Sequence, residues 1–268
     1  MARGLWLCRA CRHQTSVTAG TIFQDRRLPL RFWFRALWYV TSQKHGVSAL
    51  GLQRVVGLGS YQTAWAWLHK LRRAMVRPGR DRLSGRVEVD ETYIGGPEAG
   101  VIGRRTYAKA QVLIAAQVEG RGIGRIRLAR VSDLTRATPH GFIHDCVTPG
   151  AVICTNGLAT YRDLEGYGHE VVVLQRQDQP ASDLLPRVHL VVALLKRWLL
   201  GTHHGAVRIS HLDYYLDEFV FRFNRRQSAC RGKLFYHLVQ QAVQVEPQPY
   251  HSLHHHHHHL LGSVESSG

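Results

Sequence analysis

The pattern of apolar and polar positions predicts helices in the first third of the chain. In LPLRFWFRALWYVTSQK, residues 28–44, apolar side chains recur three or four residues apart, which is the period of one helix face. Pro29 suits the first turn of such a helix, where an amide hydrogen would have no partner. The expected inward positions are Phe32, Trp33, Ala36, Leu37 and Val40. We therefore expect a helix whose aromatic side chains form part of a core.

Residues 47–75 predict two further helices joined by a short turn. The first ends near Val56, the turn covers residues 57–59, and Ser60 is a good N-terminal cap for the second. This arrangement is typical of a DNA-binding helix-turn-helix, although a plain helical hairpin with a solvated basic face gives the same pattern. On the first interpretation the basic residues of the second helix contact DNA. These residues are Lys70, Arg72 and Arg73.

The middle of the chain changes to the patterns of strands. Residues 86–96 begin with a short strand, residues 110–120 form a near-continuous apolar run, and residues 124–131 alternate. A helical segment at about 134–147 follows, and then come the strand AVICTN, a short helix and the strand EVVVLQ. This order predicts an α/β domain of the ribonuclease H-like class, a mixed five-stranded sheet flanked by helices. In such folds catalytic acids lie at the ends of the first and fourth strands, where Asp90 and Asn156 fall.

Two helices are expected after the sheet. RVHLVVALLKRWLL, residues 187–200, is apolar almost all round, yet His189 and Lys196 lie two turns apart on nearly the same face. This polar stripe either faces an active site or carries two side chains that reach the surface. In residues 213–227 the basic residues suit either contact with phosphate or the negative end of the helix dipole. They are Arg222, Arg225 and Arg226.

Acids in the first predicted strand indicate a cation site. Strands usually avoid acids, yet this one carries Glu88, Asp90 and Glu91. A buried carboxylate is costly unless a cation compensates it, and Mg²⁺ or Mn²⁺ prefers carboxylate oxygens. The alternative is an edge strand whose charges face water. Glu91 is the weaker candidate, because alternation turns it to the face opposite Asp90.

Composition and charge point to a class of partner. Lys and Arg number 35 against 19 acids, which gives a net charge of +16 and a pI near 10.3, and 44% of the residues are hydrophobic. Such an excess favours a polyanion, with nucleic acid first, although some basic proteins have no such partner. No stretch has the features of a signal peptide or the length of a membrane span. With five cysteines, an odd number, a reducing cytoplasm is the expected location.

Cys8-x-x-Cys11 has the spacing of half a tetrahedral zinc site. No second pair lies nearby, so the motif is either half of a zinc ribbon or two free thiols in an N-terminal strand. If the ribbon's first half is missing, Met1 is not the natural start. The tail from Glu246 contains six consecutive histidines, His254 to His259, which are a purification tag or a native His-rich segment, and it is set aside from the site.

Several blocks together resemble a known family. VEVDETYIGG, TNGLATYRDL, HLVVALLKRWLLGTHHGAV and YLDEFVFRFNRR are similar to blocks of bacterial insertion-sequence transposases of the DDE superfamily, in the group that carries an N-terminal zinc ribbon. CRACRHQTSVTAGTIF resembles the second half of that ribbon. The resemblance covers about residues 4–243.

The resemblance implies roles for individual residues. Asp90 corresponds to the first metal-binding acid, His189 takes the third position, which varies in this group, and Lys196 matches a Lys seven residues further on. Asn156 stands where the pattern T-D-G-x-x-x-Y has Asp. Because an amide oxygen is neutral and two adjacent metal ions need negative charge, Asn156 is expected to be a metal position that has lost its acid. Arg197, beside Lys196, is expected to contact DNA phosphate.

The resemblance also implies cofactors, partners and an activity. Mg²⁺ or Mn²⁺ would occupy a two-metal site, and Zn²⁺ would bind only in a complete ribbon. The partner would be double-stranded DNA, both the element's terminal inverted repeats and the target, bound by a homo-oligomer in the cytoplasm, nucleoid-associated when on DNA, with no membrane. The expected activity is metal-dependent DNA cleavage and strand transfer, impaired by Asn156. The alternatives are a catalytically inactive DNA-binding derivative and a ribonuclease H-like nuclease that does not transpose.

The expected domain organisation has four parts. They are a truncated zinc-ribbon remnant at residues 1–24, a helical DNA-binding region at 25–82, a ribonuclease H-like catalytic domain at 83–243, and a disordered His-rich tail at 244–268.

Overall fold

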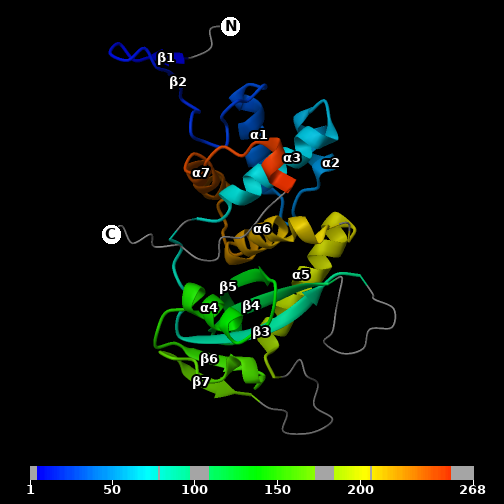
Figure 1. The fold of residues 1–268 in the computed structure, drawn as a ribbon. Helices are drawn as coiled ribbons and strands as arrows, with labels where there is room; N and C mark the ends of the chain where they lie inside the picture. Colours follow the sequence, from blue (N-terminus) through cyan, green and yellow to red (C-terminus); the bar gives the residue numbers. More distant parts are fainter. Residues whose placement is uncertain (1–4, 78, 97–108, 173–183, 206, 255–268) are drawn as a thin grey trace. The chain divides into compact units, whose positions relative to one another are not determined.

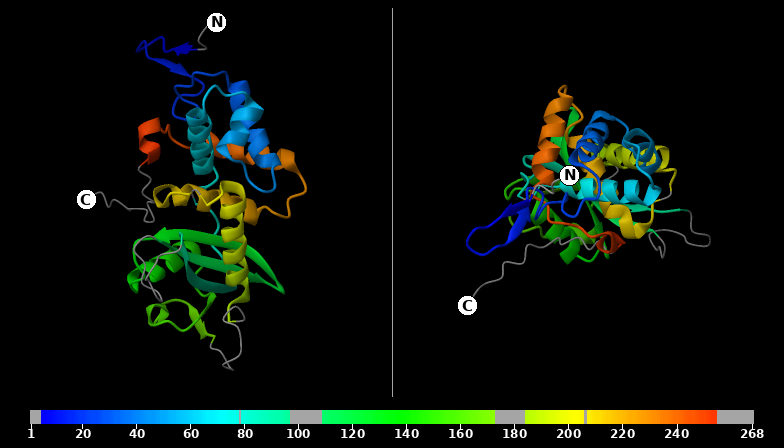
Figure 2. Two further views of the ribbon diagram at one scale, coloured as in Figure 1. Left: turned by 90° about the vertical axis from the view of Figure 1, so that its right-hand side faces the viewer. Right: turned by 90° about the horizontal axis from the view of Figure 1, so that it is seen from above.

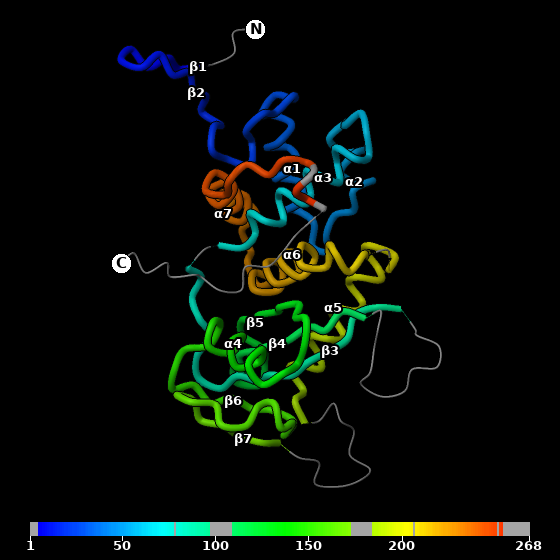
Figure 3. Tube along the Cα trace, viewed as in Figure 1, coloured from blue at the N-terminus to red at the C-terminus, as the bar shows by residue number. Residues whose placement is uncertain are grey.

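The chain forms two compact units, each with its own core (Figure 1). The computed structural model describes residues 5–77, 79–96, 109–172, 184–205 and 207–254. The first unit combines Met1–Pro78 with Gln227–His255, and the second holds Gly79–Arg226. In Figure 3 the trace passes from the blue and cyan first unit into the green and yellow second unit, and it returns to the first in orange.

Helices make up most of the first unit. Its elements are β1 (Leu5–Leu7), β2 (Gln14–Ser16), α1 (Leu30–Ser42), α2 (Ala49–Val56), α3 (Tyr61–Ala74), α7 (Arg231–Ala242) and the short turn η4 (Tyr250–His254). Trp33 of α1 stacks on Trp67 of α3 with ring centroids 3.9 Å apart. The inward face predicted for α1 is confirmed, except that Phe32 is only half-buried. A segment from the far end of the chain completes this core, because Phe235 of α7 packs edge-on against Trp38 of α1.

The turn between α2 and α3 has the predicted chemistry. Gly57 closes α2 with a φ of 77°, a left-handed conformation that favours glycine. The Ser60 hydroxyl accepts a hydrogen bond from the Thr63 amide at 3.1 Å, and this bond caps α3. Both predicted helices and their cap are thus confirmed. Whether α3 enters a DNA groove stays a prediction.

The second unit is built on a sheet with the strand order β5-β4-β3-β6-β7. Its strands are β3 (Arg86–Ile94), β4 (Ala110–Glu119), β5 (Gly122–Val131), β6 (Val152–Thr155) and β7 (Gly168–Val171). Its helices are α4 (Ala137–Cys146), α5 (Pro186–His203) and α6 (Leu212–Asn224), with the short turns η1 (Ala159–Tyr161) and η3 (Ile209–His211). β3, β4 and β5 pair antiparallel, whereas β6 and β7 continue the sheet in parallel. This is the mixed sheet of the ribonuclease H-like fold, as predicted.

Helices cover both faces of this sheet, and α5 crosses one of them (Figure 2, left). On that face Val188 of α5 and Phe219 of α6 belong to one core with Ile114 of β4. On the other face Ile143 of α4 packs in a second core with Val89 of β3. Because β3 is the central strand, its side chains alternate between two buried surroundings. No helix in the described ranges is both long and apolar enough to cross a membrane.

β3 is longer than predicted, and Asp90 lies inside it rather than at its end. Antiparallel pairing with β4 runs from Val87 to Ile94, whereas parallel pairing with β6 stops at Glu88. Asp90 therefore lies just beyond the last residue paired with β6. The prediction that Asp90 lies at a strand end is therefore correct for the pairing of β3 with β6. It is wrong for the pairing with β4, which continues to Ile94.

The second unit also ends earlier than the expected catalytic domain. α7 belongs to the first unit, because its aromatic side chain joins that core. Part of the expected disordered tail is ordered, since Leu253 of η4 is fully buried. Residues 255–268 of the tail, with most of its histidines, lie outside the described residues. The same holds for residues 1–4 of the ribbon remnant and for the end of the predicted strand EVVVLQ.

An ion pair between the half-buried Arg130 and the buried Asp213 joins β5 to α6. Arg130 donates from Nε and Nη2 to Asp213 Oδ2 at 3.0 and 2.9 Å, and Asp213 is 0% exposed. We expect Asp213→Ala to lower the free energy of unfolding by about 2 kcal/mol, because two charge-assisted hydrogen bonds are lost and the half-buried Arg130 guanidinium loses its partner. Urea denaturation followed by circular dichroism measures the change. The control is Arg125→Ala, which breaks the exposed pair with Asp81 and is expected to cost less than about 1 kcal/mol; equal losses would contradict the prediction.

Candidate functional site

One face of β3 presents polar side chains to the core beside α5. Glu88, Asp90 and Thr92 alternate along the strand and are 4%, 7% and 7% exposed, whereas Val87 and Val89 point into the core beside α4. Carboxylates at the centre of a sheet are costly unless they are compensated. The partners of these acids therefore decide what the site can do.

Asn156, directly after β6, is the first partner of Asp90. Its Nδ2 donates to Asp90 Oδ1 at 3.0 Å, and its Oδ1 accepts from the Leu158 amide at 3.2 Å, which is the contact of an Asx turn. Gly157 has a φ of 81°, and a Cβ there would lie 2.7 Å from Val171 Cγ1, so glycine is required. The Asn-Gly pair therefore forms a turn and also brings an amide to Asp90.

His189, in the first turn of α5, is the second partner. Its Nε2 lies 4.0 Å from Asp90 Oδ2, and its side chain is 34% exposed. The structure thus brings together three predicted site residues from β3, from the end of β6 and from α5. Their roles as metal ligands stay predictions.

The residues around Asp90 do not fit a two-metal site. They supply one carboxylate, one imidazole, and a neutral amide whose oxygen faces Leu158. In the part of the chain that the structure describes, no group of three or more His, Cys, Asp or Glu side chains could hold a metal. Two adjacent divalent cations need more negative charge than a single carboxylate provides. That position 156 is the place of a lost carboxylate stays a prediction.

Glu91 lies on the opposite face of β3, as alternation predicted. Its Oε2 accepts a hydrogen bond from the Tyr161 hydroxyl at 3.1 Å, and Tyr161 is buried in the core beside α4. Because Tyr161 belongs to η1, just after Asn156, this bond ties the segment that carries Asn156 to the central strand. Glu91 therefore supports the site without facing Asp90.

Lys196 and Arg197 lie further along α5 and are both exposed. Their neighbour Leu195 is fully buried, so the helix keeps its apolar side in the core while these two cations face solvent. That arrangement suits contact with phosphate, and the contact itself stays a prediction.

The basic residues at the end of α6 have partners within their own unit. Arg222 Nη2 lies 2.7 Å from a carboxylate oxygen of Glu218, which is 1% exposed. The guanidinium groups of Arg225 and Arg226 lie over the rings of Phe221 and Phe223, both at 4.2 Å. Arg226 is the exposed member of the three, but its Nη atoms donate to the backbone carbonyls of Ile123, Gly124 and Phe223. A phosphate contact by these three residues stays a prediction.

The basic residues of α3 differ in exposure. Arg72 is 2% exposed, so its guanidinium does not present a surface to DNA, and the prediction of a DNA contact is not supported at this residue. Lys70 and Arg73 are half-buried. Arg72 therefore lies on the buried side of α3, whereas Lys70 and Arg73 are partly accessible to solvent.

A wide pocket of about 850 Å³ adjoins Lys70 in the first unit. Arg26, Arg27 and Ser60, the cap of α3, also line it. Burial lowers the pKa of the Lys70 ammonium, and the Asp25 carboxylate acts in the opposite direction. Cations beside a helix N-terminus make this pocket a favourable place for an anionic group.

Cys8 and Cys11 lie in the turn of the β1–β2 hairpin. Both thiols are exposed and free, and the Cys8 amide donates to the carbonyl of His13 at 2.8 Å. Hydrogen bonds from Cys11 lower the pKa of the Cys8 thiol, which favours the thiolate that metals bind. Within the described ranges these are two of the four ligands that a structural zinc ion needs.

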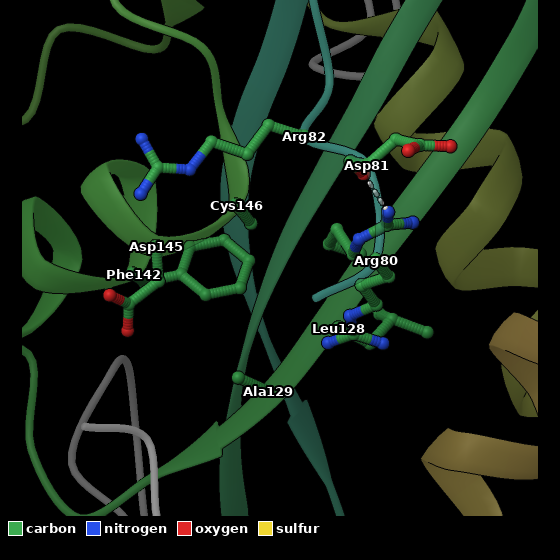
Figure 4. Close-up of a pocket in the computed structure, with 9 residues that line it drawn as sticks. Arg80, Asp81, Arg82, Leu128, Ala129, Phe142, Asp145 and Cys146 are labelled. Carbon is green, nitrogen blue, oxygen red and sulfur yellow. Dashed lines mark hydrogen bonds between the residues drawn. The ribbon is translucent and has the colours of Figure 1, made fainter. Parts of the chain in front are cut away.

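A smaller pocket, of about 50 Å³, lies beside α4 (Figure 4). In Figure 4 Arg82 and Asp81 extend in opposite directions from its rim. Burial lowers the pKa of Arg127 to about 10, and the nearby charge of Arg80 acts in the same direction. Burial raises the pKa of Cys146 to about 12, so this thiol is inert at neutral pH. The pocket is too small for a nucleotide and shares no residue with the Asp90 group.

One contact of this site was not predicted. Glu88 accepts hydrogen bonds from the amides of Arg187 and Val188 at the start of α5. The sequence could have indicated this contact in part. Pro186 marks the start of a helix, and the amides that follow it need hydrogen-bond acceptors. Which acid would meet them depends on the packing of α5 on β3.

The chain is similar to proteins of transposable elements. The model of the ISXO2-like transposase domain matches residues 82–224, more than half of the chain. An uncharacterized protein in transposable element ISH50 of Halobacterium salinarum is 24% identical over 234 residues, covering 81% of this chain and 77% of that protein. The matched domain runs from just before β3 to the end of α6 and contains the Asp90 group.

Two solved structures are similar at a lower level. They are a pre-cleavage Mos1 transpososome and the Mos1 strand transfer complex, with TM-scores of 0.27 and 0.25 and 13% identity in each case. Each match covers 82% of this chain and 81% of the other.

Proposed function

Because the chain belongs to the family of ISXO2-like transposase domains, we propose that it is the transposase of an insertion sequence. The family's chemistry is hydrolysis of DNA phosphodiesters followed by strand transfer. The proposed substrate is double-stranded DNA, namely the terminal inverted repeats of the element and a target site. The observation that carries the proposal is the meeting of Asp90, Asn156 and His189 beside the central strand of a ribonuclease H-like sheet.

The roles proposed for these residues follow their chemistry. Asp90 and His189 are the groups able to bind Mg²⁺ or Mn²⁺, which when bound would offset the charge on the attacking and leaving oxygens. Asn156 replaces a carboxylate by a neutral amide, so the site is impaired as it stands. Lys196 and Arg197 are proposed to bind DNA phosphate as a point charge and as a planar fork. A homo-oligomer on DNA in the cytoplasm is part of the proposal.

The charge of the protein supports DNA as the partner. The net charge is +16, and such a field attracts polyanions over long range. The exposed cations of α5 in the second unit and the pocket around Lys70 in the first unit are the surfaces that we propose for phosphate.

A second candidate is a DNA-binding relative that does not cut. The favouring observation is the hydrogen bond from Asn156 to Asp90, because it compensates the buried carboxylate without any cation. Both candidates bind DNA, and metal-dependent nicking of a DNA end separates them.

Binding to the element's end is expected to weaken steeply as salt rises. Each phosphate neutralised by Lys or Arg releases counterions, so the logarithm of affinity falls linearly with the logarithm of salt. Fluorescence anisotropy of a labelled duplex, from about 50 to 200 mM KCl, measures this slope. Lys196→Ala is expected to reduce the slope by about one, while Arg225→Ala, which removes a cation held over an aromatic ring, reduces it less. Affinity that does not change with salt would contradict the DNA-binding proposal.

A further inference from the structure

Glu88 holds the start of α5 against the central strand. Its Oε2 accepts the Arg187 amide at 2.8 Å and the Val188 amide at 3.1 Å. Its Oε1 accepts Arg187 Nη1 at 3.1 Å. Glu88 is 4% exposed, so these bonds replace water around a buried carboxylate.

The two amides are those that the helix leaves without partners. An α-helix cannot bond its first amides internally, but Pro186 has no amide hydrogen and the His189 amide already donates to the Leu185 carbonyl at 3.0 Å. The amides of Arg187 and Val188 remain, and one carboxylate oxygen satisfies both. The negative charge also faces the positive end of the helix dipole.

This contact lies next to the contact between Asp90 and His189. Glu88 and Asp90 are successive residues on one face of β3, about 7 Å apart along the strand, and Val188 and His189 are adjacent on α5. The Glu88 contact and the 4.0 Å approach of His189 Nε2 to Asp90 Oδ2 are therefore neighbouring contacts between the same two elements. A change in the first contact is therefore expected to displace the second.

Arg187 further restricts the helix. Its Nη2 donates to the carbonyl of Gly120, in the turn between β4 and β5, at 3.0 Å. The side chain thus joins Glu88 to a second point of the sheet, which opposes rotation of α5 about its own axis.

We propose that Glu88 is a positioning residue, which fixes the N-terminus of α5 on β3 so that His189 faces Asp90. It touches no reacting atom and acts through His189. The inference rests on the proposed function, because the position of His189 affects a rate only if the site cleaves DNA.

The test compares Glu88→Ala and Glu88→Gln in a chain that also carries Asn156→Asp, where cleavage is expected. Gln keeps one oxygen for both amides and loses the ion pair with Arg187, so it is the conservative rescue. Asp213→Ala, which breaks an ion pair elsewhere in the same unit, is the control for lost stability. The readouts are hydrogen exchange at residues 187–189, anisotropy with an end duplex, thermal unfolding, and single-turnover nicking with Mn²⁺.

Glu88→Ala is expected to speed exchange at these amides, to leave DNA affinity within about two-fold, and to slow nicking by about 100-fold, since small misplacements of a reacting group cost that much. Glu88→Gln is expected to restore most of the rate. The proposal is overturned if Glu88→Ala slows nicking no more than Asp213→Ala at equal loss of stability, or if exchange at residues 187–189 does not change. If the Asn156→Asp chain binds the end duplex and cuts nothing, the proposed function fails first and the positioning role falls with it.

Discussion

Asn156→Asp is expected to raise Mn²⁺-dependent nicking of an element-end duplex by about 100- to 1000-fold. A metal site supplies several kcal/mol of transition-state stabilisation, and each 1.36 kcal/mol corresponds to about a factor of ten in rate. In the structure the Asn156 amide lies 3.0 Å from Asp90 Oδ1. An Asp at position 156 would place a second carboxylate beside Asp90, and together the two would carry the negative charge that divalent cations require.

The geometry of the turn favours this substitution over any other at the site. Asp has the size of Asn, and its oxygen can still accept the Leu158 amide that Asn156 Oδ1 accepts at 3.2 Å. The positive φ of Gly157 is unaffected. The backbone can therefore stay in place while the charge changes.

Single-turnover nicking measures the effect, with the two chains compared side by side on one duplex. Asn156→Ser, which removes the amide and adds no charge, is the matched control and is expected to stay inactive. Asp90→Asn in the active chain is expected to return the rate to background, because it removes the carboxylate of Asp90. If the unaltered chain cuts as fast as the Asn156→Asp chain, a neutral amide is tolerated and the charge argument is wrong.

The second large effect is on stability. Without divalent cations, Asn156→Asp is expected to lower the free energy of unfolding by about 3 kcal/mol at neutral pH, because a partly buried hydrogen bond becomes a repulsive contact between two carboxylates. The sign with pH follows from the same contact. Repulsion raises the folded-state pKa of one carboxyl above its unfolded value. The loss of stability is therefore absent at low pH, where that carboxyl is protonated, and it develops as the pH rises through the raised pKa.

Urea denaturation of both chains at several pH values, with and without Mn²⁺, tests this prediction. The difference in free energy of unfolding between the two chains is expected to become smaller as the pH falls. Adding Mn²⁺ is expected to reduce it as well, because an ion that binds only the folded state stabilises that state by about 2.7 kcal/mol at 100 times its dissociation constant. Asn156→Ser again controls for loss of the hydrogen bond alone. A difference independent of both pH and Mn²⁺ would mean that the introduced carboxylate does not lie against Asp90.

Local patterns were sufficient for most of the elements. The Ser60 cap, the helix from residue 30 and the strands β4 and β5 follow from short-range periodicity and turn chemistry, since each depends on neighbours in the chain. The limits of elements were less well predicted. β3 extends to Ile94 because its partner β4 supports it, and α7 leaves the expected catalytic domain because its aromatic residue packs on α1.

For the site, the sequence by itself determined the residue types and their order: Asp90 on the central strand, a neutral Asn156 after the next parallel strand, and His189 at the start of a buried helix. Only the tertiary structure decided which groups meet. It brought the amide of Asn156 to Asp90, buried Arg72, turned Glu91 to Tyr161, and gave Glu88 the free amides of α5. The physical reason is that periodicity fixes which face a side chain occupies, whereas its partner comes from a distant segment whose register and distance are set by packing.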